Sequence, residues 1–523
     1  MNSHVAENIK DVLQYAQENG GKINDSVRLT LYKLAEEYYA ADEYKNIWNK
    51  DGRLLPLADS LFNFIDTCNS YGLFPSDYHF KELLNLKNKL ATDSLARKDA
   101  ITWTKIDLML TDGFFRLTEH LKKGRIIEDD SAHVKGDTHL QKGVSINALK
   151  TFLAQGQLAT VLHKFEPDIR AYDSLKQTIP AFLDSIDRTE YTHIDYPWKD
   201  SIAMLETLQK RLEEEKFITD ADSEVDSLML AKAIKKAQRR KGLAIDGKVT
   251  PALIKRLNLT WKDYFKKIAL NLDRYKSLIA PMPEKYIWVN LPSFYLKVYD
   301  HDTVALLSRI VVGKPTTPTP VLSSAVSNMV TYPQWTIPSS IIKKEVLPAL
   351  KKDPGYLASK GFSLVDSKGA EVDPHTVKWK KYTDDIPYKV VQGSGDDNAL
   401  GVFKFNFYSP FDIYLHDTNQ RNFFKNKARA LSHGCVRVQE WEKLAEFVMA
   451  NDSMLTTKGP LPYNMDSIKS WLAVKAKKTV YVRNRLPLFI RYFTAEAENG
   501  HIRFYDDIYD SDNELIRKYY RGE

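Results

Sequence analysis

Cysteine is scarce in this sequence: Cys68 and Cys435 are the two among 523 residues. One pair permits at most one disulfide, so a framework of cross-links does not hold the fold together, and a chain of this length can build several hydrophobic cores instead. Cys68 ends an apolar helical run, 61–68, and is expected inside a core. Because Cys435 lies in the motif described below, we predict that it stays reduced.

Long apolar runs are missing as well. No stretch approaches the length that crosses a bilayer, and the first residues lack the charged and then apolar segments of a secretory signal. We therefore expect a chain without a transmembrane segment, either cytoplasmic or exported with its targeting segment removed.

Several kinds of site are also missing. No spacing of cysteine, histidine and carboxylate residues typical of a metal site occurs. The glycine-rich stretch 393–401 is not followed by Gly-Lys-Ser or Gly-Lys-Thr, as a phosphate loop requires. The net charge of +7 is too small for a nucleic-acid-binding surface but suits an anionic polymer. We expect no cofactor, no metal and no nucleic-acid partner.

The composition is that of a folded protein, with 43% hydrophobic and 27% charged residues. Apolar residues recur at helical spacing through 1–210, a compact helical unit follows over 211–262, and 263–283 forms a linking helix. From 284 to 523 apolar residues alternate, which predicts strands, except that about 339–389 is helical and charged like an inserted subdomain. We predict an α+β multidomain chain.

The strongest chemical pattern surrounds Cys435. His433 precedes it by two residues and His416 by 435 − 416 = 19, with Ser432 and Gly434 in the same run. A thiol needs a nearby base or cation to become a nucleophile, and the oxyanion that forms at an attacked carbonyl needs backbone donors. A lone cysteine is more often a small buried residue, but this combination predicts a Cys/His acyl-transfer site.

The spacing His-x(16)-His-Gly-Cys, with Ser432 in the usual Ser/Thr position, resembles the signature of the L,D-transpeptidase (YkuD-type) catalytic domain. The segment 332–338 is similar to an entry strand of the same domain. An insertion such as 339–389 acts as a lid in the large members of this family. The chain departs from the family where an Arg-Gln-x-Pro-Gly run is usual, because 391–395 lacks both the Arg and the Pro.

Two upstream regions carry looser resemblances. The segments 71–78 and 107–115 are similar to the scaffold domain of the large Gram-negative L,D-transpeptidases. The frame from Gln238 to Leu253, with Thr250 as a predicted helix cap, resembles a small three-helix peptidoglycan-binding module. Glycan binding and a spacer that has lost its ligand are both open for this module.

The resemblance implies roles for the site residues. Cys435 would be the nucleophile and His416 the base, oriented by the backbone carbonyl or the side chain of Asp417. His433, Ser432 and Gly434 would shape the loop and the oxyanion region, with the N–H groups of Gly434 and Cys435 as donors. The residues that would contact substrate are Arg437, Trp335 and Tyr414; for Arg437 a structural salt bridge is an equal alternative.

The resemblance implies a periplasmic enzyme that forms 3→3 cross-links in peptidoglycan and reacts with carbapenems. Its partners would be stem peptides, glycan and other wall-synthesis enzymes. Two alternatives stay open: an L,D-carboxypeptidase, in which water resolves the acyl-enzyme, and an inactive wall-binding scaffold. A serine D,D-transpeptidase is disfavoured because Ser340–Lys343 and Ser511–Asn513 match two of its motifs but no Lys-Thr-Gly follows.

Overall fold

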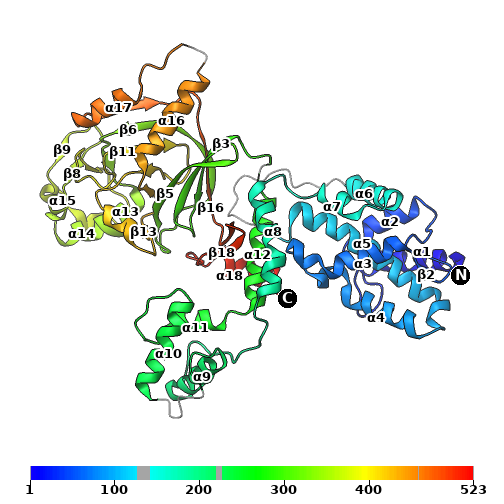
Figure 1. The fold of residues 1–523 in the computed structure, drawn as a ribbon. Helices are drawn as coiled ribbons and strands as arrows, with labels where there is room; N and C mark the ends of the chain where they lie inside the picture. Colours follow the sequence, from blue (N-terminus) through cyan, green and yellow to red (C-terminus); the bar gives the residue numbers. More distant parts are fainter. Residues whose placement is uncertain (1, 127–141, 220–225, 279, 457–458, 522–523) are drawn as a thin grey trace.

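A computed structural model describes residues 2–126, 142–219, 226–278, 280–456 and 459–521. Three parts are visible in Figure 1: a helical domain at the N-terminal end, a small helical module, and a β-rich domain. Two long helices, α8 (Arg170–Ser185) and α12 (Trp261–Lys276), lie where the three parts meet. The architecture is α+β, as predicted.

The N-terminal domain is built around helix α5 (Ala100–Lys123), which is buried along most of its length. In its middle the buried Asp107 carboxylate accepts hydrogen bonds from the backbone N–H groups of Ile47 and Trp48 and from the Asn49 side chain, at 3.1, 3.0 and 2.8 Å. The surrounding elements are α1 (Asn2–Glu18), α2 (Tyr32–Ala40), the hairpin β1 (Asn49–Lys50) and β2 (Arg53–Leu54), α3 (Pro56–Asp66), α4 (Phe80–Thr92), α6 (Lys142–Gln155) and α7 (Leu158–His163). Cys68 is fully buried in this core, as predicted.

The small module consists of α9 (Ser201–Glu214), α10 (Ser227–Arg240) and α11 (Pro251–Asn258), which share one hydrophobic core. The boundary placed at 210/211 from the sequence falls inside α9, and that helix packs with α10 and α11. Thr250 caps α11 as predicted, because its hydroxyl accepts a hydrogen bond from the Leu253 N–H at 3.2 Å.

The β-rich domain has one large sheet, in the order β11-β12-β14-β5-β4-β3-β16-β6-β15. Strand β6 also pairs with β11, so the sheet closes on itself. Its strands are β3 (Lys285–Asn290), β4 (Tyr295–Asp300), β5 (Thr303–Gly313), β6 (Leu322–Thr331), β11 (Phe403–Phe407), β12 (Leu415–His416), β14 (Val436–Val438), β15 (Lys478–Tyr481) and β16 (Pro487–Arg491), and β13 (Ala430–Ser432) pairs with β5. Helices α16 (Trp441–Leu455) and α17 (Met465–Ala473) pack on its core.

The inserted segment has a core of its own. It holds α13 (Ser339–Ile341), a π-helical turn (Ile342–Val346), α14 (Leu347–Lys352) and α15 (Tyr356–Ser359), as the helical prediction requires. It also holds a small sheet, in the order β7-β10-β8-β9, made of β7 (Trp335–Thr336), β8 (Phe362–Val365), β9 (Glu371–Val372) and β10 (Lys389–Gln392). The sequence did not predict these strands, because two to four residues give too few alternations to stand out.

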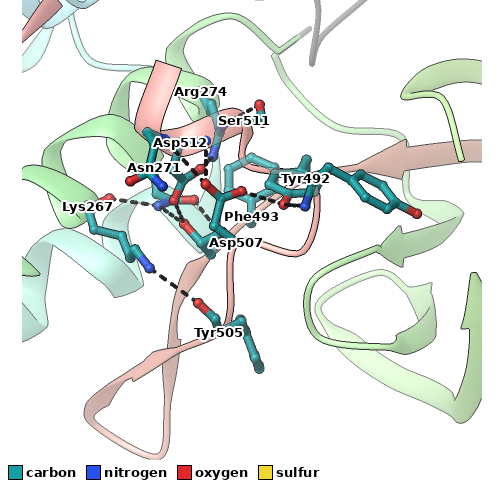
Figure 2. Close-up of polar contacts among 12 residues, drawn as sticks. Lys267, Asn271, Arg274, Tyr492, Phe493, Tyr505, Asp507, Ser511 and Asp512 are labelled. Carbon is teal, nitrogen blue, oxygen red and sulfur yellow. Dashed lines mark hydrogen bonds and ion pairs between the residues drawn. The ribbon is translucent and has the colours of Figure 1, made fainter. Parts of the chain in front are cut away.

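The chain ends with the hairpin β17 (Ala495–Glu498) and β18 (His501–Phe504) and helix α18 (Ser511–Tyr519), which pack against α8 and α12. A buried polar cluster joins α12 to this C-terminal segment (Figure 2). Arg274 of α12 donates to the Asp512 carboxylate at 2.7 Å, and both side chains are nearly inaccessible to solvent. Asp507 accepts from Tyr492 at 2.6 Å. Burial, and then the negative charge of the nearby Asp512, raises the pKa of Asp507.

This cluster gives a stability prediction. Arg274→Leu leaves the buried Asp512 carboxylate without its cation, so the free energy of unfolding should fall by about 3–5 kcal/mol. Arg503→Leu is the control, because the Arg503–Glu498 pair is half exposed and should contribute less than about 1 kcal/mol. Urea unfolding followed by circular dichroism measures both; equal effects for the two variants would contradict this account.

Candidate active site

Three neighbouring strands of the large sheet carry the site. Lys404 of β11 lies opposite His416 of β12 in the antiparallel ladder, and His416 lies opposite Arg437 of β14 in the parallel ladder. Residues in register on adjacent strands project from the same face of a sheet. Cys435 directly precedes β14, and the Val436 N–H donates to the Tyr414 carbonyl at 3.2 Å, so the loop that holds Cys435 comes beside the strand that ends in His416.

The nucleophile loop is held by Ser432. Its hydroxyl donates to the Cys435 carbonyl at 2.6 Å and accepts from the Gly434 N–H at 3.2 Å. Gly434 has a φ of +117°, a conformation that residues with a Cβ rarely adopt. Since the Gly434 N–H is already bound to Ser432, it is not the free oxyanion donor expected from the sequence. The N–H of Cys435 has no hydrogen bond within the described residues and is the donor available there.

The other side of the Gly434 peptide is held by Thr319. The Thr319 hydroxyl donates to the Gly434 carbonyl at 2.8 Å and accepts from the Gly313 N–H at 2.9 Å. Tyr509, from the C-terminal segment, accepts from the Thr319 N–H at 3.2 Å and donates to the Gly313 carbonyl at 2.8 Å. The loop geometry therefore depends on residues far from the motif in sequence.

His416 is 4% exposed. Its Nδ1 forms a short hydrogen bond with the backbone carbonyl of Asp417. A carbonyl oxygen can only accept, so Nδ1 carries the proton and Nε2 is the nitrogen able to take one. Burial first, and then the positive charge of Arg437, lowers the pKa of His416 to about 3, so the imidazole is neutral near pH 7.

The Asp417 side chain does not orient the imidazole. Its carboxylate accepts from the Val402 N–H at 3.1 Å and from Arg421 at 2.7 Å, which ties the strand end to the glycine-rich loop. The sequence left open whether the carbonyl or the carboxylate of Asp417 orients the imidazole. In the structure the carbonyl contacts the imidazole, and the carboxylate does not.

The Cys435 side chain is partly exposed and forms no disulfide. Burial raises the pKa of the Cys435 thiol, while hydrogen bonding with Tyr414 and the charges of Lys404 and Arg437 act in the opposite direction. No hydrogen bond joins the thiol to His416 within the described residues.

Tyr414 lies next to the Cys435 thiol, and Trp335 lies near Tyr414 with its indole nitrogen buried and without a hydrogen-bond partner among the described residues. Burial and then the neighbouring Cys435 raise the pKa of Tyr414. The Tyr414 ring meets the His416 ring edge-on, with centroids 5.6 Å apart. Trp335 comes from β7, at the entry to the inserted segment, so this segment contributes to the walls of the site.

Arg437 makes no salt bridge among the described residues, contrary to one of the two roles left open by the sequence. Its guanidinium donates to Gln420 at 2.8 Å and to Thr418 at 3.3 Å, and its Nε is buried without a partner. An arginine held by neutral groups keeps its charge available for an anion.

His433 points toward the inserted segment instead of the thiol. Its Nε2 lies 2.7 Å from Glu345, which belongs to the π-helical turn. His433 therefore contacts the inserted segment, and His416 is the histidine of the motif that lies in the sheet. In the part of the chain that the structure describes, no group of three metal-binding side chains is found.

Sequence reasoning missed Lys404, Thr319 and Glu345. Lys404 sits in an alternating strand, but its position opposite His416 depends on how strands distant in sequence pair. Thr319 and Glu345 reach the nucleophile loop through tertiary contacts alone. The run Thr319-Pro320 resembles an entry strand of the transpeptidase domain, which gave Thr319 no site role, and no local signal marks Lys404 or Glu345.

Three family models match parts of this chain. Residues 284–462 match the L,D-transpeptidase catalytic domain (YkuD). Residues 33–179 match a family described as "Scaffold domain", and residues 203–257 one described as "Putative peptidoglycan binding domain".

Among curated proteins, a "Putative L,D-transpeptidase" of Haemophilus influenzae is 37% identical over 250 residues, which is 48% of this chain. The chain spans about half (49%) of that relative's length.

Two solved structures of Enterococcus faecium L,D-transpeptidase were also found. The NMR structure of a catalytic domain acylated by ertapenem is 15% identical and covers 40% of this chain and 98% of its own, with a TM-score of 0.18. The crystal structure of a Cys-to-Ser mutant is 12% identical, covers 45% and 65%, and has the same TM-score. Residues 284–462 are thus similar to the L,D-transpeptidase catalytic domain (YkuD), and the two upstream matches cover much of the helical part of the chain.

Proposed function

We propose that this protein is a cysteine acyltransferase that forms 3→3 cross-links between peptidoglycan stem peptides in the periplasm. The observation that carries the proposal is the pairing of β12 with β14, which sets a partly exposed Cys435 beside a buried His416 whose Nδ1 is held by a carbonyl. In the described residues, no helix has the length and apolar character needed to span a bilayer.

The proposed reaction begins with the Cys435 sulfur. His416 Nε2 takes the thiol proton as the sulfur attacks the carbonyl carbon after an L-configured stem residue. The Cys435 N–H stabilises the oxyanion of the tetrahedral intermediate. When the intermediate collapses, the C–N bond breaks, His416 protonates the departing amine of the D-amino acid, and a thioester remains on Cys435.

The second half of the reaction returns the enzyme to its starting state. The side-chain amine of a diamino acid in an acceptor stem attacks the thioester and gives its proton to His416. The C–S bond then breaks, and Cys435 regains the proton. Arg437, whose charge is not neutralised by a carboxylate in the described residues, is suited to a carboxylate of the stem peptide.

The flanking domains fit a wall-associated substrate. The small module, similar to peptidoglycan-binding domains, would hold glycan while the catalytic domain acts on the stem peptide. The inserted segment, which contacts the nucleophile loop through Glu345, would cover the site as a lid. Other wall-synthesis enzymes are the macromolecular partners that we expect.

The nucleophile can be tested directly. Wild-type protein incubated with a carbapenem should gain the mass of one adduct on the peptide that contains Cys435, because the β-lactam carbonyl acylates the thiolate. Cys435→Ala should gain none and should lose all cross-linking activity while keeping its circular dichroism spectrum. Muropeptide analysis with purified tetrapeptide stems should show dimers; tripeptide with free D-alanine would instead mean an L,D-carboxypeptidase, and no product an inactive scaffold.

The base can be tested with a matched pair of histidine variants. His416→Ala should lower the rate of acylation by about two to four orders of magnitude, the usual effect of losing a general base. His433→Ala should cost much less, because His433 contacts Glu345 instead of the thiol. Single-turnover acylation kinetics compare the two, and a larger loss for His433→Ala would reverse the roles.

The lowered pKa of His416 also leads to a prediction of how the free energy of unfolding depends on pH. The pKa of His416 falls from an ordinary value of about 6.5 in the unfolded chain to about 3 in the folded one, so the folded state binds fewer protons between these values. Stability should therefore be unaffected by His416 above about pH 6.5 and fall as the pH drops toward 3, by about 3 kcal/mol near pH 4.5.

Unfolding measured near pH 7.5 and near pH 4.5 tests this difference. His416→Gln, which cannot titrate, should lose less stability than the wild type over the same interval. Parallel losses in the two proteins would show that other groups carry the acid sensitivity.

A further inference from the structure

Lys404 occupies a position that the proposed reaction does not use. It lies opposite His416 in the β11–β12 ladder, and Arg437 lies opposite His416 on the other side. The three side chains therefore form a basic row across β11, β12 and β14, and Cys435 stands just before the last strand of the row.

Neither outer member of the row has an acidic partner. Among the described residues Lys404 and Arg437 form no salt bridge. The Lys404 ammonium instead lies 3.8 Å from the centroid of the Tyr414 ring. Both residues are half-buried, so each charge is partly removed from water, which is costly when no anion is near. An unneutralised pair at this place suggests that the anion is one that forms during the reaction.

The groups around Lys404 identify that anion. They are the Cys435 thiol, the Tyr414 phenol, the His416 imidazole, and the cations Arg437 and Lys477, none of which carries a permanent negative charge. Burial lowers the pKa of Lys404, and the neighbouring Cys435 acts against this decrease, so the ammonium and a thiolate stabilise each other. Lys404 contacts the same Tyr414 that hydrogen-bonds to the thiol.

We propose that Lys404 is a positioning residue that supplies the positive charge needed to hold Cys435 as a thiolate, acting from the strand opposite His416. The proposal rests on the proposed function of Cys435 as nucleophile. The proton that leaves the sulfur goes to His416, as in the reaction above. Because the same ammonium repels an imidazolium, Lys404 also favours the return of that proton from His416 to the leaving amine.

The charge of Lys404 can be separated from its packing. Lys404→Met keeps the aliphatic stem over Tyr414 but removes the charge, whereas Lys404→Arg keeps a cation. Lys477→Met is the matched control, because Lys477 is an exposed neighbouring cation outside the row. Full-length proteins are alkylated with iodoacetamide over a range of pH, and mass spectrometry follows the peptide that contains Cys435, so the buried Cys68 does not interfere.

In Lys404→Met the alkylation profile should move upward by about one pH unit, so alkylation at neutral pH slows about tenfold. Lys404→Arg and Lys477→Met should follow the wild-type profile. The proposal is overturned if Lys404→Met titrates like the wild type, or if Lys404→Arg is shifted as far as Lys404→Met. Should Lys404→Met fail the circular dichroism check, Lys404→Gln takes its place.

The readout separates this proposal from the proposed function. Alkylation reports on the thiol alone, so the shift can be measured even if no cross-linked muropeptide forms. Conversely, Lys404→Met could show the wild-type pH dependence of alkylation and the wild-type level of cross-linking. That result would contradict the role of Lys404 and would leave the proposed function unaffected.

Discussion

The pairing of β12 with β14 is the constraint on which the site depends. Cys435 and His416 are far apart in the sequence, and the pairing of a two-residue strand with a three-residue strand brings their segments onto neighbouring strands. Such short strands have few hydrogen bonds of their own. They keep their register because β11 and β5 flank them in the same closed sheet, whose inner face is packed with apolar side chains.

Burial sets the chemistry of this site as strongly as proximity does. Removing His416 from water keeps it neutral, and the same desolvation makes the Cys435 thiolate costly. Two cations without acidic partners in the described residues, Lys404 and Arg437, offset the second cost. The result is a site in which the imidazole is unprotonated near pH 7 and a negative charge on the sulfur lies near two cations.

The C-terminal segment links the nucleophile loop to the rest of the chain. Tyr509 forms hydrogen bonds with the backbone of Gly313 and of Thr319, and the Thr319 hydroxyl donates to the Gly434 carbonyl. The same segment contributes Asp512 to the buried cluster with Arg274 of α12 (Figure 2). A contiguous set of hydrogen bonds thus runs from the meeting point of the domains to the peptide next to the nucleophile.

Local patterns of residue type and spacing predicted the His-x(16)-His-Gly-Cys motif and the α+β class. They also predicted the helix cap at Thr250 and the alternation in β3, β4 and β5. The sequence could not decide which group orients His416, that Gly434 gives its N–H to Ser432, that His433 faces Glu345, or that Lys404 joins the basic row. These depend on strand pairing and loop packing between residues far apart in the chain. A carbonyl, a hydroxyl or a charge acts through distance and burial, and only the tertiary structure fixes both.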